Sequence, residues 1–251
     1  MTRPPQIVAM GGGGFSMEPD NLLLDRFVLS LSKAATPKVC FVGTASGDAE
    51  SYVGRFYASF RTLNCIPGDL SLFRPPTADL VSFVMEQDVI YVGGGNTRNL
   101  MALWREWGLD AIFRQAWLGG VVMAGISAGS LCWFQQGVSD SVIPGGLAPI
   151  ECMGLLPGSN CPHYDGEPGR RPAYHLLLRQ GRLGAGYAAD DGAALYFVGQ
   201  KLERVVSSRA TAKAYSVRLV GNEVEEVALK TDWLGSAEGA AMSTGIPSTI
   251  G

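Results

Sequence analysis

The stretch VVMAGISAGSLCW, residues 121–133, decides the fold of this chain. It begins with a short apolar run typical of a buried strand, and apolar residues return at near-helical spacing after residue 128. The pentapeptide Gly-Ile-Ser-Ala-Gly separates the two halves and places Ser127 at the turn. In such an elbow the flanking glycines relieve crowding, the serine hydroxyl is lifted clear of the sheet, and the next backbone N–H can bind an oxyanion. We therefore predict that Ser127 is a nucleophile and that Ala128 supplies an oxyanion-hole amide.

Strand and helix patterns alternate over the first half of the chain. Strand-like apolar runs are QIVAM, KVCFVG, DVIYVGGG and GVVMAGIS. Amphipathic patterns predict helices over residues 21–32, 50–63, 78–86 and 96–117, the last broken near residues 107–108. This alternation predicts an α/β fold with a doubly wound, mostly parallel sheet and helices on both faces.

The pattern changes after residue 133. Gly- and Pro-rich loops are predicted over residues 137–172, followed by a helix near residues 173–180 and by short strand-like runs that would extend the sheet as hairpins. We expect residues 1–234 to form a single α/β domain. The small and polar residues 235–251 show no period, and we expect a flexible tail or an expression remnant there.

The composition and charge exclude several functional classes. The 251 residues are 47% hydrophobic, enough to bury a sizeable core, and the net charge is only −3. Because the basic residues form no run, we expect no nucleic-acid partner and no membrane binding. The N-terminus lacks the apolar region of a signal peptide, and no apolar segment approaches the roughly 20 residues of a membrane span, so a cytoplasmic location is expected. The five cysteines contain no Cys-x-x-Cys pair, which argues against a disulfide framework and a zinc site.

Two further glycine-rich segments follow predicted strands. MGGGGFSM, residues 10–17, does not complete the Gly-x-Gly-x-x-Gly spacing of a dinucleotide site, because Ser16 stands at the last position. We interpret it as a loop whose backbone passes close to a neighbouring strand or a ligand. YVGGGNTRNLM, residues 91–101, opens a helix capped by Asn96 or Thr97, and its unpaired N–H groups could bind an anion or an oxyanion. A plain tight turn explains that segment equally well.

A serine nucleophile needs a base, and the chain contains two histidines. His163 lies in NCPHYDGEPG, a polar loop in which its side chain can face a cleft. His175 lies in a helical stretch, where a structural or surface role is the simpler interpretation. We therefore predict that His163 is the general base.

The third member of a triad is a carboxylate that accepts a hydrogen bond from the histidine. Asp140 in QGVSDSVIP is the leading candidate, because it lies between the serine and the histidine in a loop after the elbow helix. Glu151, on the next loop, is the alternative. Asp165 and Glu167 also compete, but they stand so close to His163 in sequence that reaching around its ring is difficult.

These residues carry a resemblance to a known family. The combination of YVGGGNT, GISAGS leading into SDS, and PHYD resembles the peptidase E and cyanophycinase family of serine peptidases. That family has a fold akin to the class I glutamine amidotransferases, with serine where those enzymes have cysteine. The likeness covers most of the chain, from the first strand through the strands after the histidine loop.

The resemblance implies a role for each matching residue. Ser127 would be the nucleophile and His163 the base, and Gly94, Gly95 and Ala128 would supply the oxyanion-hole amides. Family members use either Asp or Glu as the third residue, so Asp140 is kept with Glu151 as the alternative. The implied reaction is hydrolysis of a short peptide through an acyl-enzyme, and it requires no metal or organic cofactor.

The sequence says less about which substrate side chain the site accepts than about the reaction. The best-known branch of the family removes an N-terminal aspartate from dipeptides, and such a site needs a cation to hold the aspartate side chain. Arg170 and Arg171 are candidates, although a solvated GRRP turn explains them equally well. Asp165 and Glu167 could repel an acidic substrate or capture the α-amino group of the peptide. Asn96 is a further candidate substrate contact.

Two other classes of function stay open. An α/β-hydrolase-type esterase shares the elbow, but its histidine usually follows the final strand, whereas about 88 residues follow His163 here. A non-catalytic small-molecule or nucleotide-binding domain would use Ser127 only as a helix cap. A homo-oligomer is also open, because Trp104, Trp107 and Trp117 could form a subunit contact, although large aromatics at helical spacing are more typical of a core.

Overall fold

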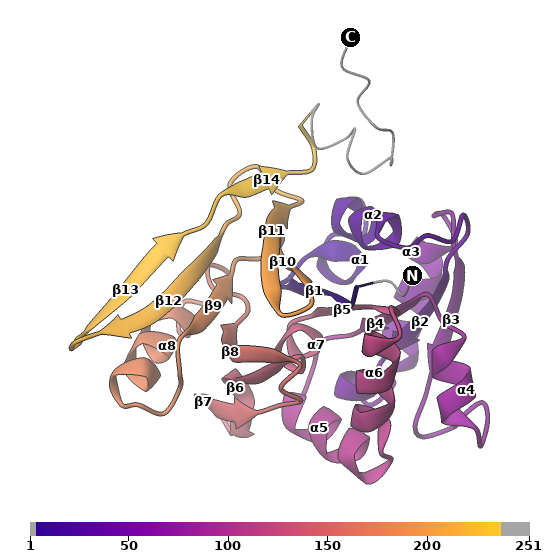
Figure 1. Ribbon diagram of the computed structural model, residues 1–251, viewed down its shortest axis with the longest axis horizontal. Helices are drawn as coiled ribbons and strands as arrows, with labels where there is room; N and C mark the ends of the chain where they lie inside the picture. The colour runs from indigo at the N-terminus through magenta and orange to yellow at the C-terminus, as the bar shows by residue number, and fades with distance from the viewer. Residues whose placement is uncertain (1–3, 237–251) are drawn as a thin grey trace.

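The computed structural model describes residues 4–236, whose strands form two sheets (Figure 1). Within that range the larger sheet has eight strands in the order β14-β11-β10-β1-β5-β4-β2-β3. They are β1 (Gln6–Met10), β2 (Lys38–Val42), β3 (Ile66–Leu70), β4 (Val89–Val92), β5 (Val122–Ile126), β10 (Ala193–Val198), β11 (Lys201–Ser207) and β14 (Thr231–Trp233). The pairs from β1 through β5, β4 and β2 to β3 are all parallel, whereas β10 runs antiparallel to β1. The predicted mostly parallel sheet is confirmed.

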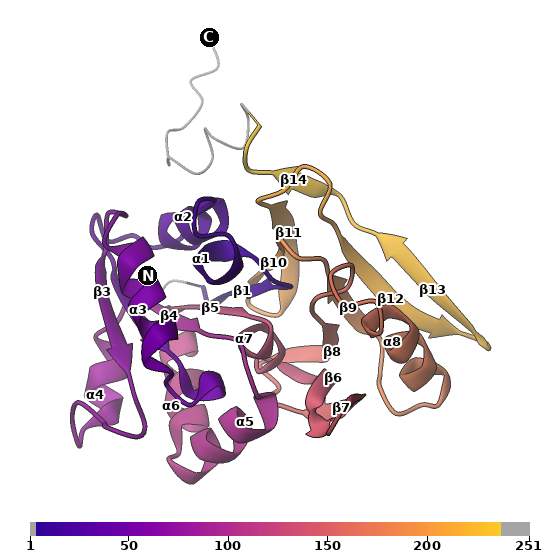
Figure 2. The same ribbon diagram turned by 180° about the vertical axis from the view of Figure 1, so that it is seen from behind.

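Helices cover both faces of this sheet (Figures 1 and 2). One face packs on α1 (Gly14–Met17), α2 (Leu23–Ser30) and α3 (Glu50–Phe60), and the other on α4 (Leu80–Met85), α5 (Thr97–Glu106) and α6 (Leu109–Leu118). Gly108, at a φ of 65°, separates α5 from α6 at the predicted break. The short η1 (Thr44–Ser46) follows β2. In residues 4–236 no helix has both the length and the apolar character to cross a membrane.

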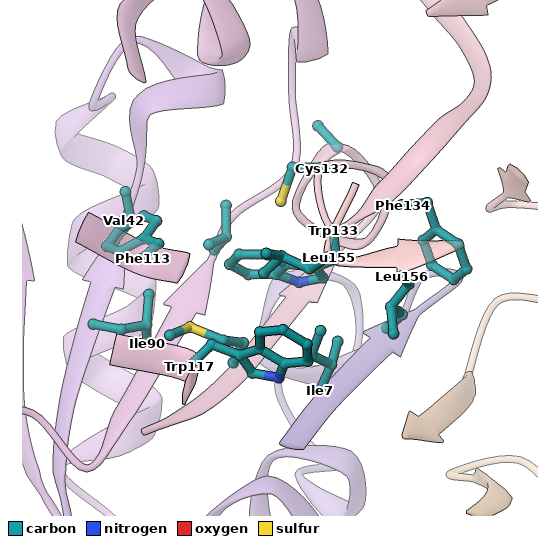
Figure 3. Close-up of a cluster of buried hydrophobic side chains, with 14 of the residues drawn as sticks. Ile7, Val42, Ile90, Phe113, Trp117, Cys132, Trp133, Phe134, Leu155 and Leu156 are labelled. Atoms are coloured by element: carbon teal, nitrogen blue, oxygen red, sulfur yellow. The ribbon is translucent and has the colours of Figure 1, made fainter. Parts of the chain in front are cut away.

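The alternation of side chains along the strands explains the two-faced burial. In β1, Val8 and Met10 face the α1–α3 layer, whereas Ile7 and Ala9 face the α5–α6 layer. Figure 3 shows the second layer, in which Trp117 and Trp133 pack beside Ile7. Of the three tryptophans considered for a subunit contact, Trp104 and Trp117 are buried in this core, and 42% of Trp107 is exposed. Two of the three are therefore core residues.

A second sheet lies beside the first and was not predicted as a separate unit (Figure 1). Its six strands within the described range follow the order β13-β12-β9-β8-β6-β7. They are β6 (Phe134–Ile143), β7 (Gly146–Glu151), β8 (Leu156–Cys161), β9 (Gly186–Ala189), β12 (Ala214–Val220) and β13 (Glu223–Ala228). The helix α8 (Arg170–Arg179) packs on this sheet through Tyr174, Leu177 and Leu178.

The loops predicted over residues 137–172 are wrong in large part, because most of β6 and all of β7 and β8 lie there. In β8, LPGSNC, the buried residues near the strand end include the polar Ser159 and Asn160, so the strand has no hydrophobic period. Both polar side chains have hydrogen-bond partners inside the protein, although the buried Asn160 Oδ1 accepts no hydrogen bond from the described residues. Ser159 Oγ lies 2.6 Å from the Tyr174 hydroxyl, and Asn160 Nδ2 donates to Ser130 Oγ at 2.8 Å. Of the predicted tail, residues 237–251 lie outside the described residues.

A buried carboxyl group supports the first turn after β1. Asp25 is fully buried, and its Oδ2 accepts the Phe15 N–H at 2.9 Å while its Oδ1 accepts the Tyr91 hydroxyl at 2.8 Å. Burial raises the pKa of Asp25 to about 6, because the two hydrogen bonds only partly offset the loss of water around the charged form. The folded protein therefore holds this proton more tightly than the unfolded chain does.

This difference predicts a pH-dependent stability. Between about pH 4 and pH 6 the unfolded chain releases the Asp25 proton while the folded chain retains it, so the free energy of unfolding falls as pH rises through this window. From the ordinary value of 3.8 to about 6, the Asp25 contribution amounts to about 3 kcal/mol. The free energy of unfolding, measured with urea from pH 4 to 7.5, should depend less on pH for Asp25→Asn than for the wild type. Parallel curves for the two proteins would contradict this assignment.

Candidate active site

The predicted strand–turn–helix elbow is present between β5 and α7 (Ala128–Leu131). Ser127 adopts φ 56° and ψ −111°, a conformation that non-glycine residues rarely occupy. The glycines on either side are required by close backbone approaches. A Cβ on Gly125 would lie 2.1 Å from the Gly129 oxygen, and one on Gly129 would lie 2.2 Å from the Val92 oxygen. The elbow therefore presents Ser127 at the end of β5 while its neighbours pack tightly behind it.

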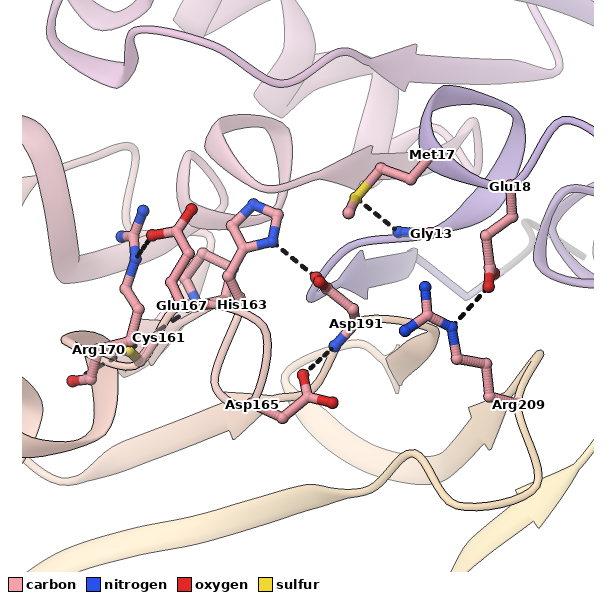
Figure 4. Close-up of polar contacts among 11 residues, drawn as sticks. Gly13, Met17, Glu18, Cys161, His163, Asp165, Glu167, Arg170, Asp191 and Arg209 are labelled. Atoms are coloured by element: carbon pink, nitrogen blue, oxygen red, sulfur yellow. Dashed lines mark hydrogen bonds and ion pairs between the residues drawn. The ribbon is translucent and has the colours of Figure 1, made fainter.

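His163 follows β8 and is paired with a carboxylate that the sequence did not single out. Its Nδ1 lies 2.7 Å from Oδ1 of Asp191, in the turn between β9 and β10 (Figure 4). Only 13% of the His163 side chain and 11% of the Asp191 side chain are exposed. A carboxylate at Nδ1 favours the tautomer with its proton on that nitrogen, which leaves Nε2 as the acceptor a general base needs.

The glycine-rich loop after β1 holds these segments in register. Three consecutive carbonyl oxygens accept backbone N–H groups from the three segments: Met10 from Ser127 at 3.2 Å, Gly11 from His163 at 3.3 Å and Gly12 from Gly192 at 3.1 Å. A Cβ on Gly11 would lie 2.3 Å from the Ala189 oxygen, so this loop does pass close to neighbouring backbone. The close-approach interpretation of MGGGG thus agrees with the structure, and the loop connects the serine, histidine and aspartate segments.

The candidate oxyanion donors differ in whether their N–H groups are engaged. The Gly94 N–H donates to the Tyr52 hydroxyl oxygen at 3.1 Å, and that oxygen also accepts the Ser16 hydroxyl at 2.8 Å. Among residues 4–236, the Gly95 and Ala128 N–H groups donate no hydrogen bond. A Cβ on Gly94 would lie 3.3 Å from Ser127 Cβ, so this loop lies against the serine. Gly95 and Ala128 are therefore the donors available to an oxyanion.

Asp140 and Glu151 do not contact His163. Asp140 is exposed on β6 and lines a cavity of about 500 Å³ together with Glu167. Glu151 ends β7 and lines a different cavity of about 510 Å³. The carboxylate that contacts the His163 ring is instead that of Asp191. The available signal was the pair of aspartates in AADDGAALYF, between two strand-like runs, because polar groups at the ends of strands commonly form sites.

Both predicted substrate-binding arginines are engaged within the protein. Arg170 is 3% exposed, and its Nε donates to Glu167 Oε2 at 2.6 Å while its Nη1 donates to the Val138 oxygen at 2.9 Å. The guanidinium of Arg171 lies 4.6 Å from the centre of the Tyr164 ring and 3.5 Å from Glu226 Oε1. Both guanidinium groups thus have carboxylate partners within the protein.

The other predicted substrate contacts also have internal partners. The Asp165 carboxylate accepts the Asp191 N–H at 2.8 Å, so it contacts the histidine's partner (Figure 4). The Asn96 side chain caps α5 by accepting the Asn99 N–H at 2.8 Å. Glu167 pairs with Arg170, as described above. Of the predicted substrate contacts, Asp165 is therefore the one that hydrogen-bonds Asp191, the partner of His163.

A further carboxyl group lies next to Asp191 in sequence. Asp190 is 4% exposed, and its Oδ2 accepts the Lys213 N–H at 3.0 Å. Burial raises the pKa of Asp190 to about 6, and the charges of Asp165 and Asp191 raise it further while the Lys213 hydrogen bond opposes the change. Below about pH 6 Asp190 is therefore protonated, which lowers the negative charge beside the His163 partner.

Known proteins match this chain over most of its length. The model of peptidase family S51 matches residues 7–205. The uncharacterized peptidase YgaJ of Bacillus subtilis (strain 168) is 60% identical over 230 residues, which cover 92% of this chain and 99% of that protein.

Two solved structures share the fold at lower identity. A crystal structure of a peptidase from an acI-B1 actinobacterium has a TM-score of 0.67 at 18% identity, covering 90% of this chain and 97% of that one. A candidate peptidase E protein from Listeria monocytogenes EGD-e has a TM-score of 0.53 at 16% identity, covering 90% of this chain and 100% of that one. The family match over most of the chain and the 60% identity to YgaJ establish that the chain belongs to peptidase family S51, the peptidase E/cyanophycinase family of serine peptidases.

Proposed function

We propose that this serine peptidase hydrolyses short peptides through an acyl-enzyme on Ser127, with His163 as general base and Asp191 as its carboxylate partner. The observation that carries the proposal is the 2.7 Å contact between His163 Nδ1 and Asp191 Oδ1. The shared hydrogen bonding of the glycine-rich loop to all three segments supports it. Asp191 replaces Asp140 and Glu151 as the proposed third residue.

Each group has a defined part in the proposed reaction. Ser127 Oγ attacks the peptide carbonyl while His163 Nε2 takes the hydroxyl proton, and the Asp191 carboxylate stabilises the resulting imidazolium. The N–H groups of Gly95 and Ala128 bind the oxyanion. His163 then protonates the departing amine and, in the second step, activates the water that releases the acyl group.

Tyr52 is expected to support this oxyanion loop. Tyr52→Phe removes the acceptor of the Gly94 N–H, so the loop loses one restraint, and we expect kcat to fall by about three- to tenfold while KM changes little. Tyr57→Phe is the matched control, because Tyr57 lies on the same helix but donates to Asp69. Steady-state peptide hydrolysis measures both variants. Equal rates for Tyr52→Phe and wild type would show that the Tyr52 hydroxyl does not support the oxyanion loop.

The proposed substrates are short peptides without a strict requirement for an N-terminal aspartate. In the described chain, the arginines around the histidine loop pair with carboxylates: Arg170 with Glu167, Arg171 with Glu226, and Arg209 with Glu18 at 2.5 Å. A paired guanidinium offers less to a substrate carboxylate than a solvent-facing one does. A strict Asp-X preference therefore has no dedicated cation among these three arginines.

Hydrolysis of a dipeptide panel tests both parts of this proposal. Asp-Leu, Ala-Leu, Met-Leu and Gly-Leu are incubated with wild type, and the products are identified by mass spectrometry. We expect cleavage of the neutral dipeptides at rates comparable with Asp-Leu. Cleavage of Asp-Leu alone would overturn the proposed breadth of substrates while keeping the mechanism. No cleavage of any dipeptide, together with hydrolysis of simple esters, would instead favour an esterase.

A further inference from the structure

The carboxylate of Asp191 lies between the backbones of two glycines. A Cβ built on Gly12 would lie 2.0 Å from Asp191 Oδ1 and 2.9 Å from its Cγ. A Cβ built on Gly166 would lie 2.2 Å from Asp191 Oδ2 and 3.0 Å from its Cγ. These separations are far shorter than van der Waals contact, so the carboxylate occupies the space that a side chain at either position would need.

The backbone conformation does not require glycine at these two positions. Gly12 and Gly166 both lie outside the left-handed region, unlike Gly13 at φ 97° and Gly95 at φ 136°. The φ angle at neither position therefore excludes an alanine. What excludes it is chiefly the Asp191 side chain, together with the flexible end of Met17 beside Gly12.

The backbone of Asp191 is held firmly, so its side chain is the part that must move. Its N–H donates to the Asp165 carboxylate at 2.8 Å, and residues 12 and 191 form a parallel β-bridge. The Gly192 N–H also donates to the Gly12 oxygen at 3.1 Å. A methyl group at either glycine would thus rotate the carboxylate away from His163 rather than displace the turn.

We propose that Gly12 and Gly166 are positioning residues, which form a slot that fixes the Asp191 carboxylate with Oδ1 toward His163 Nδ1. This inference rests on the proposed catalytic role of Asp191. Oδ1 faces Gly12 and Oδ2 faces Gly166, so the slot sets the plane of the carboxylate as well as its position. His163 binds the same oxygen that Gly12 confines.

A double-mutant cycle tests the slot. Gly12→Ala and Gly166→Ala are each made in the wild type and in Asp191→Ala, and peptide hydrolysis and Tm are measured. In the wild type each should lower kcat about 10²-fold while KM changes less than about threefold, because misplacement of a catalytic group by about 1 Å has an effect of this size. In Asp191→Ala the same substitutions should change kcat by less than about twofold, because the group they displace is gone. Gly68→Ala on β3 is the control, since a Cβ there has no atom within 4 Å.

The cycle also has a readout that does not depend on activity. If either alanine lowers Tm, the Asp191→Ala substitution should restore most of the loss, because it removes the carboxylate with which the added methyl group clashes. Equal losses of kcat and Tm in both backgrounds, or wild-type kcat and Tm for either glycine variant, would overturn the slot. If Asp191→Ala itself keeps wild-type kcat, the proposed triad fails, while the Tm coupling still reports whether the slot exists.

Discussion

Ser127→Ala should abolish peptide hydrolysis, lowering kcat by at least about 10⁴-fold, because the acyl-enzyme cannot form without the hydroxyl. The remaining activity would come from substrate binding and the Gly95 and Ala128 amides alone. Ser127 already adopts φ 56°, and an alanine tolerates this conformation no worse than serine does, so the fold should be retained. Steady-state kinetics on the best dipeptide of the panel measures the loss.

A second serine variant provides the control for this experiment. Ser30 lies on α2, a helix that covers the sheet, and is far from the elbow in sequence. Its hydroxyl donates to the Phe27 oxygen at 2.7 Å. Ser30→Ala should keep wild-type kcat, and circular dichroism should report the same fold for both variants. A folded Ser127→Ala protein that retains more than about a tenth of wild-type kcat would show that another group is the nucleophile.

The second large effect is expected at Asp191. Asp191→Asn should lower kcat by about 10³- to 10⁴-fold, because an amide favours the wrong tautomer of His163 and cannot stabilise its imidazolium form. The 2.7 Å contact and the low exposure of both side chains leave little room for water to replace the carboxylate. The kcat of the purified variant on the same dipeptide gives the measurement.

Two matched variants separate Asp191 from the acids that the sequence favoured. Asp140→Asn and Glu151→Gln make the same chemical change at exposed side chains that do not form the hydrogen bond to His163 Nδ1. We expect both to keep kcat within about threefold of wild type, as exposed positions without a charged partner commonly do. A large loss in Asp140→Asn together with near-normal Asp191→Asn would reverse the assignment.

The sequence was sufficient to predict those features that depend only on residues adjacent in the chain. The elbow at Ser127 could be predicted because the strand, the turn and the helix follow one another directly, and the glycines at residues 125 and 129 are explained by their close backbone contacts. The break between α5 and α6 was likewise predicted from Trp107 and Gly108 and found at Gly108. Local steric rules govern both features.

The partner of His163 could not be found in this way. Asp191 lies 28 residues after His163 and reaches it only because β9 pairs with β8 and the glycine-rich loop binds the turn that follows β9. Asp140 has the expected order along the chain, but β6 carries it to an exposed position. Non-local strand pairing therefore decided which carboxylate meets the histidine, and chain order did not.

The burial of Arg170 could not be predicted from the sequence either. Arg170 stands in a polar GRRP segment that looks solvated, yet it is buried between Glu167 and the Val138 oxygen. Burial of a paired charge depends on the second sheet, which the sequence did not reveal because the polar end of β8 has no hydrophobic period.

Covalent labelling with a fluorophosphonate, located by peptide mass spectrometry, tests the proposed triad most directly. Wild type should carry a single adduct on Ser127, and labelling should be at least about 10²-fold slower in His163→Ala and Asp191→Ala, because the hydroxyl then lacks its activated base. Asp140→Ala should be labelled at the wild-type rate. An adduct on another residue, no adduct at all, or equal labelling rates in wild type and Asp191→Ala would contradict a Ser127–His163–Asp191 triad.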